Sequence, residues 1–251
     1  MTDTEAPANA VTVTAAILVI GDEILSGRTK DRNIAAIAEH LSAIGIDLRE
    51  ARVVGDDESE IIVALNALRA RYDYVFTTGG IGPTHDDITA DSVAKAFGVA
   101  IALDPGADAL LKAYYDARGL DFTPARRRMA RIPNGAALIQ NVISGAPGFR
   151  LGNVIVMAGV PDIMRAMLLA VTPSLQTGAK RHVATIAVDR PESEIAEIFA
   201  AHQRRYPDVA MGSYPCLRNG RPAADLVLRA VDPARLAEAV ETLRSALSMR
   251  V

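Results

Sequence analysis

The sequence predicts an α/β fold in which a doubly wound, mostly parallel sheet is followed by a small α+β domain of the ferredoxin-like type. Two observations predict it. Between residues 14 and 97, short apolar runs alternate three times with segments of helical spacing, as in parallel strands joined by helices. Beyond Pro173 the order changes to strand, helix, strand, strand and helix, which is typical of a compact α+β sandwich.

The first three strands and helices follow clear patterns. Strands are predicted at three short runs rich in apolar residues, 14–20, 47–54 and 72–78. Helices are predicted where apolar residues recur every three or four positions, at 33–44, 59–70 and 87–97. Gly45 is a natural end for the first helix. The connections between the parallel strands are expected to be right-handed.

The remaining patterns complete two predicted domains. In the first domain we expect a helix at 108–118, a short basic helix or turn at 124–131, a buried strand at 153–157 and an apolar helix up to Val171. In the second we expect strands at 182–188, 208–212 and 224–230, and helices at 192–204 and 233–247. The prediction is therefore a flexible tail at 1–13, an α/β domain at 14–175 and an α+β domain at 180–251.

The composition excludes several classes of protein. The chain has 251 residues, a net charge of −3, one cysteine and no tryptophan. A single cysteine permits no internal disulfide and no cysteine-based zinc site. A general nucleic-acid binder usually carries a basic excess, and no apolar stretch approaches the ~20 residues that span a bilayer. The first ten residues carry acids where a signal peptide carries bases, so we predict a cytoplasmic protein without nucleic-acid or membrane partners.

The segment 77–89 (TTGGIGPTHDDIT) carries the strongest chemical signal. It connects the third strand to the third helix, at the edge of the sheet where α/β proteins bind ligands. Gly79, Gly80 and Gly82 let a phosphate approach backbone N–H groups, and the following helix offers the positive end of its dipole. Asp86 and Asp87 would repel that phosphate unless a divalent cation joined them. Mg²⁺ is typically held by one or two carboxylates together with phosphate oxygens.

Helix capping is the competing explanation for part of this segment. Thr84, with Asp87 three positions later, has the spacing of a helix N-cap, and acids favour helix starts. The loop is neither the G-x-x-x-x-G-K-[ST] motif nor the G-x-G-x-x-G motif. The sequence therefore predicts neither a P-loop NTPase nor an ordinary Rossmann oxidoreductase.

The two preceding strands also end in loops that combine glycine with acids. Gly21 is followed by Asp22 and Glu23, and Gly55 is followed by Asp56. Because the carboxyl ends of parallel strands meet at one edge of the sheet, we expect these acids to lie beside the glycine-rich segment.

Other polar residues have simpler explanations. Helix capping can explain Asp31 and Asn33 at one helix start, and Asp57 or Glu58 at the next. The arginines at 126–128 suit a solvated face, although one of them could pair with a substrate phosphate. Cys216 has no neighbouring base in the sequence, so we do not expect it to act as a nucleophile.

These loops resemble the molybdopterin-binding domain of the molybdenum-cofactor-biosynthesis type. The motifs that carry the resemblance are GDEILSG (21–27), DRN (31–33), VVGDDE (53–58), TTGGIGPTHDDIT (77–89), SGAPG (144–148) and MAGVP (157–161). The resemblance covers about residues 14–172 and is greatest to the N-terminal region of CinA-type proteins and the related domain of eukaryotic FAD synthases. Residues from about 180 onwards resemble the smaller domain that follows in that group.

The resemblance implies a site for a nucleotide or pterin phosphate at this edge of the sheet. Our first hypothesis is a metal-dependent pyrophosphatase that acts on a nucleotide diphosphate such as ADP-ribose. In this hypothesis Asp86 and Asp87 hold Mg²⁺ or another divalent cation and orient the attacking water. The residues assigned to phosphate or nucleotide binding are Thr78, Gly79, Gly80, Gly82, Thr84, Asp22, Glu23, Asp56 and Gly145.

Two further hypotheses remain open. The chain is a molybdopterin-binding or adenylylating protein of molybdenum cofactor biosynthesis, or it is a nucleotide-binding module without turnover. The resemblance also implies a homo-oligomer. Longer relatives carry a nicotinamide-nucleotide amidase domain that has no counterpart in these residues, so no deamidase activity is expected.

Overall fold

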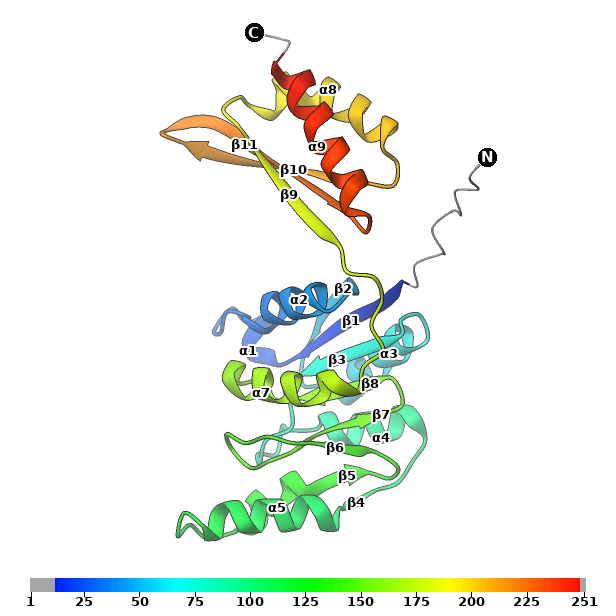
Figure 1. Ribbon diagram of the computed structural model, residues 1–251. Coiled ribbons are helices and arrows are strands. Elements are labelled where there is room, and N and C mark those ends of the chain that lie inside the picture. The colour runs from blue at the N-terminus through cyan, green and yellow to red at the C-terminus, as the bar shows by residue number, and fades with distance from the viewer. Residues whose placement is uncertain (1–11, 249–251) are drawn as a thin grey trace, which may run out of the picture. The chain divides into compact units, whose positions relative to one another are not determined.

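The structure, a computed structural model, describes residues 12–248. The chain forms two compact units, one that ends at Gly178 and one that begins at Ala179 (Figure 1). Of the tail predicted at 1–13, residues 1–11 lie outside the described residues, and Val13 already belongs to the first strand, β1 (Val13–Ile20). No helix within residues 12–248 is long and apolar enough to cross a membrane.

A six-stranded sheet forms the centre of the first unit. Its strands, in spatial order, are β2 (Ile46–Val54), β1, β3 (Tyr74–Thr78), β8 (Val154–Met157), β7 (Gly148–Leu151) and β6 (Ala137–Ile139). The first four strands run parallel and the last two run antiparallel to their neighbours. The predicted mostly parallel sheet is therefore confirmed. Strands β6 and β7 were not predicted, because the sequence around them shows mainly turn residues.

Helices cover both faces of this sheet. One face carries α2 (Asn33–Ala43) and α7 (Pro161–Val171), and the other carries α3 (Glu58–Arg69) and α4 (Thr89–Phe97). β1 contributes to both cores, because its side chains alternate between the two faces. Leu18 packs on the side of α3 and α4, whereas Ile17 packs on the side of α2 and α7, and both are fully buried. This explains why β1 is apolar from Ala15 to Ile20.

Short elements complete the first unit. They are α1 (Asp22–Leu25), α5 (Pro105–Asp116), α6 (Pro124–Arg127), the 3₁₀ turns η1 (Arg128–Ala130) and η2 (Thr172–Ser174), and the antiparallel pair β4 (Ile101–Leu103) and β5 (Arg131–Pro133). α5 begins before the helix predicted at 108–118, because the Asp104 carboxylate accepts a hydrogen bond from the N–H of Ala107 over 2.8 Å and caps it.

The third helix also begins elsewhere than predicted. The sequence placed it at 87–97, but α4 begins at Thr89. Asp87 therefore lies in the loop between β3 and α4 rather than in the first turn of the helix. Asp87 therefore does not cap α4, and its place beside the site needs another explanation.

The second unit is a three-stranded antiparallel sheet with two helices, as predicted for a small α+β domain. Its strands, in spatial order, are β10 (Ala210–Arg218), β11 (Arg221–Ala230) and β9 (His182–Val188). The helices α8 (Glu192–Arg205) and α9 (Pro233–Ser248) pack on this sheet around Ile195, Leu226 and Leu243.

One feature of the second unit differs from the prediction. The strands expected at 208–212 and 224–230 are parts of a longer hairpin, in which β10 and β11 pair along their whole length. Asn219 and Gly220 form its turn with φ values of 54° and 73°. Asn-Gly is a favoured pair for such a two-residue turn, so the sequence does carry a signal for the hairpin that the predicted separate strands left out.

Candidate functional site

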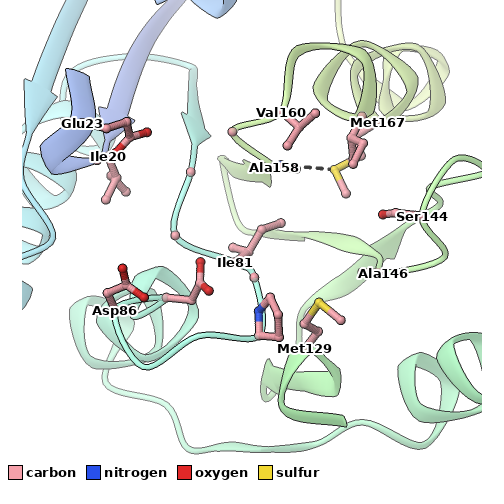
Figure 2. Close-up of a pocket in the computed structure, with 18 of the residues that line it drawn as sticks. Ile20, Glu23, Ile81, Asp86, Met129, Ser144, Ala146, Ala158, Val160 and Met167 are labelled. Carbon is pink, nitrogen blue, oxygen red and sulfur yellow. Dashed lines mark hydrogen bonds between the residues drawn. The ribbon is translucent and has the colours of Figure 1, made fainter. Parts of the chain in front are cut away.

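A cavity of about 550 Å³ lies at the carboxyl ends of β1, β3 and β8. Ligands bind at this position in open α/β sheets, and the volume is in the range of small-molecule sites. Figure 2 shows two contrasting sides of the cavity. Glu23 and Asp86 lie on one side, and Met129, Ala146 and Met167 lie on the other. The cavity therefore combines an acidic side with an apolar side.

Most of the predicted site residues line this cavity. They are Glu23, Asp56, Gly79, Gly80, Gly82, Asp86 and Asp87. Four others do not line it, namely Asp22, Thr78, Thr84 and Gly145. The glycine–acid loops that follow three different strands thus meet around one space.

Gly79 has a different role from the one predicted. Its N–H donates to the carbonyl of Met157 over 3.2 Å, so it is not free to bind a phosphate. Its φ is 103°, and a Cβ at this position would overlap the carbonyl oxygen of Ile20. Glycine is required here because the chain turns closely against β1.

The unpaired donors belong to the three residues that follow. Among the residues that the structure describes, the N–H groups of Gly80, Ile81 and Gly82 make no hydrogen bond. All three residues line the cavity. Successive N–H groups in a turn form concavities that bind anions. The loop is therefore suited to a phosphate, with Gly80 to Gly82 rather than Gly79 as the donors.

A turn closed by Thr84 positions the two aspartates. The N–H and the hydroxyl of Thr84 donate to Oδ2 of Asp87 over 2.7 and 2.6 Å. The N–H of Asp87 donates to the carbonyl of Thr84 over 3.4 Å. The pKa of Asp86 lies below the ordinary aspartate value, chiefly because the Thr84 hydroxyl can turn its single hydrogen to that carboxylate instead of to Asp87. Asp86 is therefore ionised at neutral pH.

The two aspartates suit a divalent cation only together with oxygen atoms of a ligand. Within residues 12–248, no group of three or more His, Cys, Asp or Glu side chains converges to hold a metal ion. Thr84 donates both of its hydrogen bonds to Oδ2 of Asp87. Oδ1 of Asp87 and the carboxylate of Asp86 therefore remain as possible metal ligands at the cavity. Mg²⁺ commonly binds through one or two carboxylates plus phosphate oxygens. The residues present fit a cation bound in that way.

Asp22 and Asp56 form a crossed pair that joins two loops of the site. The N–H of Asp22 donates to Oδ2 of Asp56 over 3.0 Å, and the N–H of Asp56 donates to Oδ1 of Asp22 over 3.3 Å. The Asp22 carboxylate packs against Gly55, where a Cβ would overlap it. Asp22 thus fixes the loop that carries Asp56, and it does not face the cavity itself.

Thr78 and Gly145 lie outside the cavity for structural reasons. Thr78 is only 1% exposed, and its hydroxyl has no hydrogen-bond partner within residues 12–248. Alternation along β3 turns it to the same face of the sheet as Phe76. Gly145 has a φ of 74°, and a Cβ there would overlap the side chain of Tyr114.

The capping explanations hold for two other acids. The Asp31 carboxylate accepts a hydrogen bond from the N–H of Ile34 over 2.9 Å at the start of α2. The Asp57 carboxylate accepts one from the N–H of Glu60 over 3.0 Å at the start of α3. These acids therefore satisfy helix N-termini, as the sequence suggested.

The arginines near residue 128 differ in how their charges are used. Arg127 pairs with Asp108 over 2.6 Å, and Arg126 lies over the ring of Tyr115 and donates to the backbone of Asp121. Arg128 donates to the backbone carbonyl of Asp87 over 3.4 Å and, among the described residues, makes no ion pair. Arg128 is thus the arginine of this group that lies beside the aspartates.

The apolar side of the cavity was not predicted. Its main contributors are Ile81, Met129, Ile163 and Met167, accompanied by the polar residues Asn141 and Ser144. Apolar residues at helical spacing look like ordinary core, and the segment 141–148 looks like a turn. The one available signal was the resemblance of the motifs at 144–148 and 157–161.

Comparison with known proteins matches both units to described families. The family model described as "Probable molybdopterin binding domain" matches residues 16–177, which is more than half of the chain. The chain belongs to this molybdopterin-binding domain family. A second model, described as "FAD synthase, middle domain", matches residues 180–251. The resemblance inferred from the loop motifs is thereby confirmed.

Individual relatives extend this assignment. A CinA-like protein of Desulfosudis oleivorans is 39% identical over 209 residues, which cover 79% of this chain and 51% of the relative, so the chain spans about half the length of that protein. A protein of Aeropyrum pernix is 35% identical over 208 residues, covering 79% of this chain and 78% of the relative. The crystal structure of the protein CinA from Thermoplasma acidophilum matches with a TM-score of 0.60 and 37% identity, covering 65% of this chain and 98% of that one.

Proposed function

We propose that the first unit binds a nucleotide diphosphate of the ADP-ribose type in this cavity and hydrolyses its pyrophosphate with the help of a divalent cation. One observation carries the proposal. Gly80, Ile81 and Gly82, whose N–H groups make no hydrogen bond among the described residues, line the same cavity as Asp86 and Asp87. The N–H groups suit an anion and the carboxylates suit a cation. A metal–pyrophosphate complex satisfies both.

Each group has a distinct task in this proposal. The N–H groups hold a phosphoryl oxygen and stabilise the charge that develops on it during attack by water. Asp86 and Asp87 hold the cation against the same phosphate. Bound Mg²⁺ supplies Lewis-acid polarisation of the phosphoryl group and lowers the pKa of a coordinated water. Glu23, on the same side of the cavity as Asp86, receives the proton of the attacking water (Figure 2).

Arg128 supports the same chemistry. Its guanidinium lies at the Asp87 backbone and carries no ion pair among the described residues. A planar guanidinium can bind two phosphate oxygens at once. In the proposed function it pairs with the phosphoryl group that leaves, where negative charge accumulates.

Binding of molybdopterin, or its adenylylation, is the second candidate function. Membership of the molybdopterin-binding domain family favours it. So does the apolar side of the cavity, where Ile81, Met129 and Met167 offer a surface for a flat ring system. Both functions use the phosphate and cation side of the cavity in the same way.

Incubation of the purified chain with separate substrates distinguishes these functions. The substrates are ADP-ribose, FAD, and ATP with molybdopterin, each with Mg²⁺ or Co²⁺ and each with EDTA in a parallel reaction. Release of AMP and ribose 5-phosphate from ADP-ribose, abolished by EDTA, supports the pyrophosphatase. Formation of adenylylated molybdopterin and pyrophosphate supports the second function. Nucleotide binding without any turnover contradicts the pyrophosphatase and the adenylylation, and it leaves a binding module.

A further inference from the structure

Asn141 holds the loop between β6 and β7 in a defined orientation. Its side-chain oxygen accepts hydrogen bonds from the N–H groups of Ile143 and Ser144 over 3.0 and 3.2 Å. Backbone N–H groups can only donate, so the oxygen of the Asn141 amide must face them. Its Nδ2 group consequently faces the opposite way, where it donates to the Ser144 hydroxyl over 2.6 Å and to the carbonyl of Ala146 over 2.9 Å.

This arrangement fixes what the Ser144 hydroxyl can do. A hydroxyl has one hydrogen to donate and lone pairs that accept. The Asn141 amide uses one of those lone pairs, and it offers no acceptor in return. Among the described residues, the Ser144 hydroxyl donates no hydrogen bond. Ser144 therefore presents an unused donor.

The unused donor lies on the apolar side of the cavity. Ser144 lines the same cavity as Met129 and Met167, across from Glu23 and Asp86 (Figure 2). An apolar wall with one polar group is the usual design of a ring-binding site, in which the apolar atoms contact the ring faces and the polar group contacts the ring edge. Methionine side chains adapt well to such ring surfaces.

We propose that Ser144 is a specificity-determining residue that donates a hydrogen bond to an acceptor on the edge of a flat heterocycle in the ligand. The ligand class is a phosphate or diphosphate joined to a purine or pterin ring, with a ring nitrogen or carbonyl oxygen as the acceptor. This inference rests on the proposed function, because the phosphate side of the cavity must hold the other end of the same ligand. The hydrogen bond from Ser144 would make the site bind a nucleotide more tightly than pyrophosphate alone, because pyrophosphate has no ring to accept it.

Calorimetric titration of Ser144→Ala with two matched ligands tests the inference. The first ligand is α,β-methylene-ADP, which carries the ring and resists hydrolysis, and the second is methylenediphosphonate, which lacks the ring. Both are titrated in the presence of Mg²⁺. Loss of one hydrogen bond to the ring predicts affinity for α,β-methylene-ADP about five- to tenfold weaker, with affinity for methylenediphosphonate unchanged. A pterin phosphate, titrated in the same way, shows which ring gives the larger loss.

Two control variants accompany this titration. Ser144→Thr keeps the hydroxyl and should keep most of the affinity, which separates the loss of a donor from a disturbed loop. Ser42→Ala removes an exposed serine of α2 that does not line the cavity, and it should change nothing. A thermal melt of each variant confirms that it is folded.

Several outcomes overturn the inference. Equal weakening with both ligands in Ser144→Ala would mean that Ser144 supports the loop only. Unchanged affinity for every ring-containing ligand would mean that the hydroxyl makes no contact. If the unaltered chain fails to bind methylenediphosphonate, the proposed function fails at its phosphate side. In that case adenosine or a pterin, which carries the ring without a phosphate, tests Ser144 separately. Weaker binding of that ring by Ser144→Ala would still support the role of Ser144. If no ring binds at all, the inference about Ser144 is overturned.

Discussion

Thr89 joins the start of α4 to the glycine-rich loop of the site. Its hydroxyl donates to the carbonyl of Gly79 over 2.9 Å, and its N–H donates to the carbonyl of Gly80 over 3.0 Å. The side chain is fully buried, and a Cβ on Gly80 would overlap its hydroxyl. One residue thus satisfies both carbonyls and fixes the backbone of the glycine-rich loop against the start of α4.

We expect Thr89→Val to destabilise the chain and to weaken phosphate binding. Valine keeps the shape of threonine but leaves the Gly79 carbonyl buried without this partner, which costs about 1–3 kcal/mol of unfolding free energy. Urea denaturation measures the cost. Ser92→Ala is the matched control, because the Ser92 hydroxyl donates only to Ile88 within the helix start. Equal costs in the two variants would contradict a special role for the contact between Thr89 and the loop.

Gly79→Ala should cost more stability than Gly98→Ala. Both glycines have positive φ values, 103° and 67°, so both variants carry backbone strain of about 1–2 kcal/mol. At Gly79 the new Cβ also overlaps the carbonyl of Ile20, whereas at Gly98 nothing lies within 4 Å of it. Thermal melts of the two variants measure the difference. A melting temperature for Gly79→Ala equal to that of Gly98→Ala would show that the loop can shift freely.

Substitution of the aspartates should abolish metal-dependent binding of phosphate. In Asp86→Asn and Asp87→Asn the cation loses a charged ligand, and we expect the affinity for Mg²⁺ in the presence of methylenediphosphonate to fall at least about tenfold. Asp116→Asn is the control, because that aspartate is exposed and pairs with Lys112 away from the cavity. Unchanged Mg²⁺ affinity in both cavity variants would remove these residues from the metal site.

The acid limit of metal binding should depend on Thr84. The pKa of Asp86 is lowered, so its ionised form is favoured, and this advantage exists above the ordinary aspartate pKa and is lost as the pH falls through the lowered value. Thr84→Val removes the largest cause of the lowering and should raise the midpoint for Asp86. Carboxyl NMR titration measures this midpoint.

The same titration contains its own reference. Asp57 also has a lowered pKa, chiefly because of a hydrogen bond from Ser59. That carboxylate should keep its midpoint in Thr84→Val. A shift of both groups would indicate a general change in the protein, and a shift of neither would show that Thr84 does not control Asp86.

Arg128→Ala should weaken phosphate binding more than Arg127→Ala does. Arg127 is already paired with Asp108, whereas Arg128 lies at the Asp87 backbone without an ion pair among the described residues. If Arg128 pairs with a phosphoryl group, its loss removes a charge-assisted hydrogen bond, and the affinity for α,β-methylene-ADP falls about tenfold or more. Similar affinities in the two variants would exclude Arg128 from the site.

The sequence by itself determined the sheet and the edge at which the site lies. Apolar runs such as the one in β1 predict buried parallel strands, because local periodicity records which faces are covered. The loops that follow β1, β2 and β3 each combine glycine with acids, and parallel strands bring such loops together whatever the details of packing. Glu23, Asp56, Asp86 and Asp87 could therefore be expected in one place, and all four line the cavity.

Only the tertiary structure decided what each residue of that edge can do. The N–H of Gly79 is occupied by Met157, and Asp22 is turned away from the cavity by Asp56. Ser144 became an open donor because Asn141 occupies its acceptor side. A residue's hydrogen-bonding capacity is known only after every partner within reach has been counted, and such partners can come from strands and loops far away in the chain. For this reason the loops could be predicted from the sequence, but the free donors among them could not.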